Sequence, residues 1–321
     1  MLASTCGCRH PVIDAAPCCR IIVRRTDDHF RDWVDATRRM RTLSSRALCD
    51  GFCFLEAPRI DGSGLLVSDV YGDAVYRIDA NGTVGKMVDV PGHPSGLGRL
   101  PSGTWLVVVM LEKRLACIGN GTRLESHTDL APYVRYGPND MAVDGRGRCY
   151  VGSFGFDRDG GESPRSTDLL LVEAPGEVRI VATDLWFPNG IAITSDGRLV
   201  VAESYANRLT CFDIEPDGSL SNRRTFARVN GGPDGICADQ GGGVWVSCFL
   251  GEQFVRVAEG GTITDCVPVP GRKAVACNLG GDDLRTLFIL TAETTLEGLA
   301  HGRSSSRVDL VRVEIPGAQS P

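Results

Sequence analysis

The chain has 321 residues and a formal net charge of −6, and 42% of its residues are hydrophobic. This composition is typical of a soluble globular protein and excludes collagen and a disordered chain. The acidic balance predicts no basic surface for nucleic acid, and no apolar run reaches the roughly 18 residues that cross a bilayer. We therefore expect a small-molecule partner, no nucleic-acid or membrane partner, and a cytoplasmic location.

Residues 1–39 do not share the pattern of the rest of the chain. They show no alternation of apolar and polar residues, and their aspartates argue against a targeting peptide, which is poor in acidic residues. We interpret them as an N-terminal extension that is partly disordered. Met40 then opens a single domain that spans residues 40–321.

Short apolar runs separated by turn signals fill this domain. Runs such as WLVVV (105–109) and TLFILTA (286–292) are rich in β-branched and aromatic residues, and pairs such as Asp196-Gly197 separate runs of this kind. Both features are typical of antiparallel strands joined by tight hairpins.

Four segments repeat one pattern of a proline, a small polar residue, Gly or Asp, an apolar strand, a turn and a second strand. They begin at Pro94, Pro138, Pro188 and Pro233, at spacings of 44, 50 and 45 residues. Two degenerate copies, at 56–70 and 277–292, flank them. A repeat of about 45 residues with four short strands is the size of a propeller blade. The predicted fold is all-β, a six-bladed β-propeller of four-stranded antiparallel blades.

A polar residue recurs at the start of successive repeats. The innermost strands of a propeller line a central channel, so residues at equivalent positions converge at one end of it. Carboxylate and amide oxygens are the hard ligands that Ca²⁺ prefers, and two carboxylates neutralise a dication. Single Pro-Asn-Gly tripeptides are also ordinary turns, which is the alternative interpretation. The residues at this position are Glu56, Ser95, Asn139, Asn189, Asp234 and, in the last copy, Asn278.

The chain resembles the gluconolactonase, regucalcin and luciferin-regenerating-enzyme family of six-bladed propellers, which also includes diisopropyl fluorophosphatase. The resemblance covers roughly residues 46–316 and is carried by the motifs LEAPR (55–59), GPNDMAVD (137–144), FPNGIAI (187–193) and GPDGICAD (232–239). Two positions depart from the family pattern. Ala57 stands where the family usually has Gly, and Gly137 stands where the animal sugar-lactonase forms carry a substrate-binding Arg.

The resemblance implies one divalent metal ion at the channel mouth and lactone hydrolysis as the activity. The ion is expected to be Ca²⁺, with Mn²⁺, Mg²⁺ or Zn²⁺ as alternatives, held by Glu56, Asn139, Asn189 and Asp234. In this interpretation the metal polarises the lactone carbonyl while a water molecule attacks. Asp234 is the predicted catalytic residue, as general base or as nucleophile, and a role as ligand only is the alternative.

Four further residues are predicted to contact the substrate. The inserted segment 155–168 is expected to fold over the channel mouth, the alternative being an exposed hairpin. Glu203 could instead hydrogen-bond a neighbouring blade, and His93 could be structural. The four residues are His93, Met110, Phe154 and Glu203.

Three other functions fit a propeller. A protein-binding scaffold lacks carboxylates that converge at the channel mouth, so Glu56 and Asp234 argue against it. A strictosidine synthase-like propeller keeps the fold without a catalytic metal, and hydrolysis of another ester or of a phosphoester keeps the site and changes the substrate. The fold alone does not choose among them. A closed propeller covers its own sheet edges, so no oligomer is required.

Overall fold

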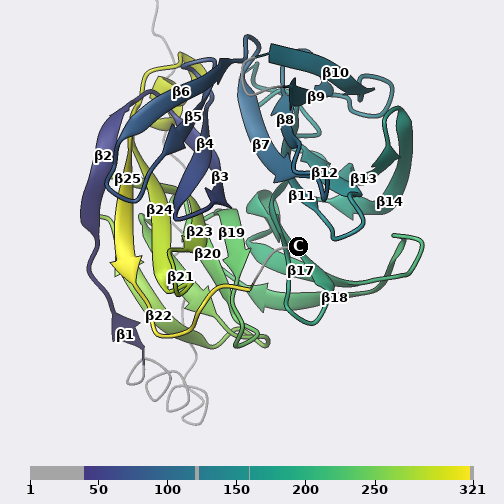
Figure 1. Ribbon diagram of the computed structural model, residues 1–321. Coiled ribbons are helices and arrows are strands. Elements are labelled where there is room, and N and C mark those ends of the chain that lie inside the picture. Colours follow the sequence, from purple (N-terminus) through teal and green to yellow (C-terminus); the bar gives the residue numbers. More distant parts are fainter. Residues whose placement is uncertain (1–39, 120–122, 159, 319–321) are drawn as a thin grey trace, which may run out of the picture. The chain divides into compact units, whose positions relative to one another are not determined.

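Tight turns join the apolar runs into antiparallel sheets. Gly147 and Gly197 have φ angles of +83° and +81°, a conformation that glycine adopts without steric cost, and they turn the chain between the first two strands of their repeats. The computed structural model describes residues 40–119, 123–158 and 160–318, and the predicted extension 1–39 lies outside them. In the described part the sheets are six in number and surround one axis (Figure 1). The predicted six-bladed propeller of four-stranded antiparallel blades is confirmed.

Blades 1 to 5 each use four consecutive strands, with the first strand innermost. The inner strands contact one another in a ring around the axis. Blades 1 and 2 consist of β3 (Leu55–Asp61), β4 (Gly64–Asp69), β5 (Ala74–Ile78), β6 (Val84–Asp89), β7 (Pro94–Arg99), β8 (Trp105–Val109), β9 (Arg114–Gly119) and β10 (Arg123–Asp129). Blades 3 to 5 consist of β11 (Pro138–Val143), β12 (Cys149–Ser153), β13 (Thr167–Ala174), β14 (Glu177–Leu185), β15 (Pro188–Ile193), β16 (Arg198–Glu203), β17 (Arg208–Ile214), β18 (Leu220–Arg228), β19 (Pro233–Ala238), β20 (Val244–Cys248), β21 (Gln253–Val257) and β22 (Ile263–Pro268).

Blade 6 closes the ring with strands from both ends of the domain. Its order is β23 (Lys273–Gly280), β24 (Thr286–Glu293), β25 (Ser305–Arg312) and then β2 (Arg46–Phe52). The purple β2 therefore lies beside the yellow β25 in Figure 1. A short strand, β1 (Arg41–Thr42), adds to the outer edge of blade 5 in parallel with β22.

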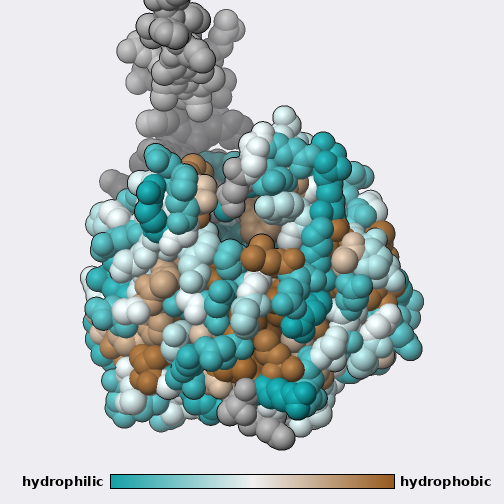
Figure 2. Space-filling view, turned by 90° about the horizontal axis from the view of Figure 1, so that it is seen from above, coloured by the Kyte–Doolittle hydropathy of each residue, from teal (hydrophilic) through white to brown (hydrophobic). Residues whose placement is uncertain are grey.

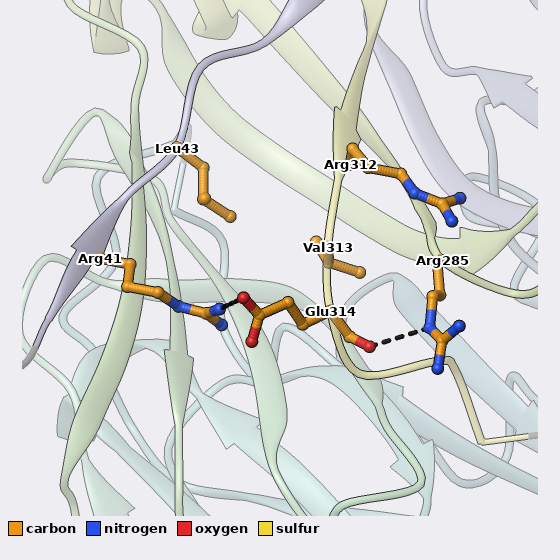
Figure 3. Close-up of a pocket in the computed structure, with 6 residues that line it drawn as sticks. All are labelled: Arg41, Leu43, Arg285, Arg312, Val313 and Glu314. Carbon is orange, nitrogen blue, oxygen red and sulfur yellow. Dashed lines mark hydrogen bonds and ion pairs between the residues drawn. The ribbon is translucent and has the colours of Figure 1, made fainter.

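Ion pairs reinforce this closure on the outside of the propeller. Arg41 forms ion pairs with Asp265 of β22, at 2.6 Å, and with Glu314. Arg285 donates from Nε to the backbone oxygen of Glu314 at 2.9 Å, so two arginines converge on one residue (Figure 3). Arg312 pairs with Asp283. These groups line a cavity of about 440 Å³. Because its arginines are already paired, this cavity is a structural junction between the two ends of the domain.

The hydrophobic core lies between neighbouring blades. One cluster combines Val200 and Phe226 of blade 4 with Val246 and Val255 of blade 5. The face shown in Figure 2 is largely hydrophilic, with apolar residues gathered near its middle. Within the described residues, no helix has the length and apolar character needed to cross a bilayer.

The inner strands approach one another closely at the glycine of the repeated motif. A Cβ atom on Gly190 of β15 would lie 2.4 Å from the backbone oxygen of Asp234 in β19, and one on Gly96 of β7 would lie 2.7 Å from the backbone nitrogen of Met141 in β11. Glycine is therefore needed there for space between strands.

Gly190→Ala is expected to lower the free energy of unfolding by about 1–3 kcal/mol, because its Cβ would overlap the backbone of β19. Gly85→Ala in β6 is the matched control, because its Cβ would meet open space. This control should leave stability unchanged or raise it slightly. Urea unfolding followed by tryptophan fluorescence measures both, and equal midpoints for the two variants would contradict the packing argument.

Candidate metal and substrate site

Five inner strands each place a polar residue at their second position. In each strand the register shifts at this residue or directly after it, as in a β-bulge. A bulge changes the direction of a side chain relative to a regular strand. All five side chains line one cavity of about 960 Å³. They are Glu56, Ser95, Asn139, Asn189 and Asp234, so the structure brings the four predicted ligands together.

The sixth repeat begins earlier in the chain than predicted. Strand β23 starts at Lys273, so Ala274 takes the second position. Asn278 lies further along and donates from Nδ2 to the backbone oxygen of Pro58 at 2.8 Å. The predicted place of Asn278 at the start of its repeat is wrong, because this copy lacks the leading proline that marks the starts of repeats 2 to 5.

Hydrogen bonds orient the two amides of this ring. Ser95 Oγ donates to Asn139 Oδ1 at 3.0 Å, and Asn139 Nδ2 donates to Asn189 Oδ1 at 2.8 Å. Asn189 Nδ2 donates to Ser204 Oγ at 3.2 Å, and this hydroxyl donates to the backbone oxygen of Pro233 at 2.7 Å. An amide oxygen has two lone pairs, so each of the two oxygens keeps one for a further ligand.

The two carboxyl groups of the ring, Glu56 and Asp234, are buried and influence each other's protonation. Asp234 is 6% exposed, and its Oδ1 has no hydrogen-bond partner among the described residues. Burial raises the pKa of Asp234 well above its usual range, the charge of Asp140 adds to this, and Asn189 and Arg158 oppose it. Burial also raises the pKa of Glu56, and the charges of Asp234 and Asp140 raise it further. The hydrogen bond from the Ala57 N–H and the charge of Arg59 lower it by less. A cation would stabilise both ionised carboxylates.

Arg59 compensates the third carboxylate near the ring. Asp140 stands where repeats 2, 4 and 5 have glycine, and its Oδ1 accepts a hydrogen bond from Arg59 Nη2 at 2.8 Å. The same nitrogen donates to the backbone oxygen of Met141 at 2.6 Å. This pairing leaves Glu56 and Asp234 as the acidic pair that faces the cavity.

A second ring of residues surrounds the first, and we call it the collar. In each of blades 1 to 5, the residue after the second strand donates its N–H to the backbone oxygen of a residue just before or at the start of the inner strand, at 2.9–3.1 Å. All ten residues line the cavity. The pairs are Val70 with Phe54, Met110 with His93, Phe154 with Gly137, Ser204 with Phe187, and Phe249 with Gly232.

Three of the four predicted substrate contacts belong to the collar. They are His93, Met110 and Phe154. Glu203 is completely buried and does not line the cavity. Its carboxylate accepts hydrogen bonds from Arg208 Nε at 2.7 Å and from the Trp186 N–H at 2.9 Å. Glu203 is therefore a structural group, although Arg208 belongs to its own blade 4 and not to a neighbouring blade as the alternative expected.

Backbone strain accompanies the ring and the collar. Ala57, His93 and Phe187 have φ angles of +48°, +63° and +56°. Non-glycine residues in this region are unusual and are found most often at functional sites. The angle of Ala57, beside Glu56, explains why glycine suits this position.

The sequence interpretation missed much of the apolar wall. Phe54, Phe187 and Phe249 occupy positions equivalent to those of His93 and Met110, so the repeat itself held the signal for them. The inserted segment contributes Arg158 to the cavity. Helix α2 (Leu296–Ala300), between β24 and β25, closes the side that blade 6 leaves open, and no repeat predicts it.

A ring of oxygen-bearing side chains in a six-bladed propeller is the feature to compare with known proteins. The model of the SMP-30/Gluconolactonase/LRE-like region matches residues 54–293, so the chain belongs to this family. It is 29% identical over 265 residues to a 6-deoxy-6-sulfogluconolactonase of Pseudomonas putida, covering 79% of this chain and 88% of that protein. It is 28% identical over 225 residues to the pentonolactonase XacC of Haloferax volcanii, covering 67% and 75%. A solved structure of luciferin-regenerating enzyme shares the fold, with a TM-score of 0.73, 20% identity, and coverage of 84% and 94%.

Glu203→Gln is expected to lower the free energy of unfolding at pH 7 by about 1–3 kcal/mol, because the buried amide no longer pairs with Arg208. Burial raises the pKa of Glu203, but hydrogen bonds from Arg208, Thr210 and Trp186 outweigh it and leave that pKa below its usual range. The carboxylate thus stabilises the fold above the ordinary pKa of glutamate, about 4, and this contribution is lost as the pH falls through the folded value.

Chemical unfolding between pH 3 and pH 8 tests this role. The stability difference between the native protein and Glu203→Gln should narrow at acid pH, while the exposed Glu177→Gln should match the native protein throughout. A difference that does not depend on pH would argue against the charged pair.

Proposed function

We propose that this protein is a divalent-cation-dependent hydrolase that opens the ring of a small-molecule lactone. The observation that carries the proposal is the ring of two acidic and two amide side chains at one end of the channel, in a chain of this family. The lactonase names of the relatives support the choice of lactone as substrate.

The side chains of the ring fit a hard cation. Its prospective donors are all oxygen atoms, and one of them, Asp234 Oδ1, is buried without a hydrogen-bond partner among the described residues. Glu56, Asn139, Asn189 and Asp234 would hold the ion, with Ca²⁺ as the expected species and Mn²⁺, Mg²⁺ or Zn²⁺ as alternatives. When bound, the cation would polarise the lactone carbonyl and stabilise negative charge on its oxygen.

Asp234 is the proposed general base. Its Oδ1 takes a proton from a water molecule whose oxygen attacks the acyl carbon, and the ring C–O bond then breaks. The same proton is available to the departing alkoxide, so the single product is an open-chain hydroxy acid with a free hydroxyl group and a carboxyl group. The hydrogen bonds from Ser95 to Asn139 and from Asn139 to Asn189 keep the two amides fixed while this happens.

Removal of metal should invert the order of stability between the native protein and Asp234→Asn. In chelator-treated protein, Asp234→Asn should melt at a higher temperature than the native protein, because it removes one of two buried like charges. In millimolar Ca²⁺ the native protein should be the more stable of the two, because binding stabilises the folded state. Differential scanning calorimetry measures both orders, with Glu177→Gln as a charge control. The same order in both conditions would refute a cation at these carboxylates.

Rates of lactone hydrolysis at saturating metal distinguish whether Asp234 acts as a general base or only as a metal ligand. We expect Asp234→Asn to lower kcat by about 10²–10⁴-fold. Glu56→Gln should mainly weaken metal binding, so excess Ca²⁺ should recover much of its kcat. Proton release in a pH-stat assay with a panel of γ- and δ-lactones measures both variants. If excess metal restores both variants equally, Asp234 is a ligand only.

A further inference from the structure

The collar around the proposed metal site is mostly apolar. Two of its ten positions, Gly137 and Gly232, carry no side chain. Of its two polar side chains, Ser204 already donates to Pro233 and accepts from Asn189. His93 lies edge-on to Tyr71, with ring centroids 5.5 Å apart. The remaining six are Phe54, Val70, Met110, Phe154, Phe187 and Phe249.

Aromatic rings form a preformed wall on one side of the cavity. Phe154 and Phe187 are stacked with centroids 4.6 Å apart and an interplanar angle of 30°. Tyr205 lies against Phe187 at 5.8 Å. A Cβ atom on Gly137 would lie 3.6 Å from Met110 Cβ and 3.7 Å from Phe154 Cδ2, so a side chain there would enter the space beside this wall. The glycine leaves this space for a ligand.

The apolar surface continues outward to the mouth. Three leucines that line the cavity are highly exposed. Leu111 and Leu250 each follow a collar residue in sequence and are 66% and 57% exposed, and Leu296 begins helix α2 and is 61% exposed. Single exposed leucines are normal, but several at the mouth of one cavity mark a surface that a ligand covers. Lys113, Arg158 and His301 line the same cavity, so the apolar surface covers part of it.

A polyhydroxylated ligand would be poorly matched to this wall. Each hydroxyl group that leaves water needs a hydrogen-bond partner in the protein. A buried hydroxyl group without one weakens binding. Alkyl or aryl groups gain from the same burial, by about fourfold in affinity per methylene.

From this wall we infer that the substrate is a lactone that bears a large apolar substituent, aryl or long alkyl, which lies against the collar and extends toward the mouth. The inference rests on the proposed lactone hydrolysis and specifies its substrate class. The ester group of the lactone lies beside the side chains of Glu56 and Asp234, and the substituent contacts Met110, Phe154 and Phe249. This chain therefore differs in preference from relatives whose names specify sugar lactones.

Lactones of one ring size test the substituent alone. We would compare kcat/KM for δ-valerolactone, δ-decanolactone, a phenyl-substituted δ-valerolactone and D-glucono-δ-lactone, all with saturating metal. Substituted rings should exceed δ-valerolactone by about 10- to 100-fold, and the sugar lactone should be the poorest substrate. If the lactones are hydrolysed but the substituent does not raise kcat/KM, or the sugar lactone is preferred, the inferred substrate class is wrong and the proposed lactone hydrolysis stands. If none of the four is hydrolysed, the proposed function fails and the inference fails with it.

Two variants locate the substituent. Gly137→Leu fills the space beside Phe154, and Phe249→Ser makes one collar position polar. Each should reduce the ratio of kcat/KM for δ-decanolactone over δ-valerolactone by at least about fivefold. Ile180→Ser, on the outer strand β14, removes an exposed apolar side chain away from the cavity and should keep the ratio. Melting temperatures confirm that each variant is folded, and an unchanged ratio in a folded collar variant would contradict the assignment.

Discussion

The close approach of the inner strands at the axis is the constraint on which the rest of the structure depends. Gly190 and Gly96 bring neighbouring strands together at backbone distance, and the bulge beside each glycine turns the preceding polar residue into the channel. Five strands with such a register shift place Glu, Ser, Asn and Asp side chains around one cavity. The same register sets the collar, because each collar pair is joined by a backbone hydrogen bond next to a bulge. Packing at the axis therefore determines both the oxygen ligands and the apolar wall.

Charge in the ring is distributed unequally. Arg59 pairs with Asp140, whereas Glu56 and Asp234 share a buried environment that raises the pKa of each. Such an arrangement is costly for stability in the absence of a cation, and functional sites commonly tolerate costs of this kind. Elsewhere the protein compensates buried charge directly, as Arg208 does for Glu203. Within the described residues, no arginine is directly paired with Asp234, which belongs to the candidate site, whereas Glu203 is paired with Arg208 and stabilises the fold.

The repeat in the sequence predicted the fold and most of the ring. Each Pro-x-Gly or Pro-x-Asp start marks an inner strand, and equivalent positions in a propeller meet at the axis, so Asn139, Asn189 and Asp234 were predictable together. Blade 6 was placed out of register because its start lacks both marker residues, and its second position is Ala274. Glu203 ends a strand as Ser153 and Val109 do, and only the structure reveals the arginine that pairs with it. Helix α2 has no counterpart in the other blades, so no periodic signal predicted its contribution to the cavity wall.

The central claim is that the ring binds a divalent cation beside an apolar collar. A crystal structure of the protein grown in Ca²⁺, with anomalous data collected at long wavelength, tests it most directly. The account predicts one anomalous peak bounded by oxygen atoms of Glu56, Asn139, Asn189 and Asp234, at ligand distances of about 2.3–2.6 Å. A calcium peak elsewhere in the protein, with Asp234 Oδ1 still unligated, would contradict the account.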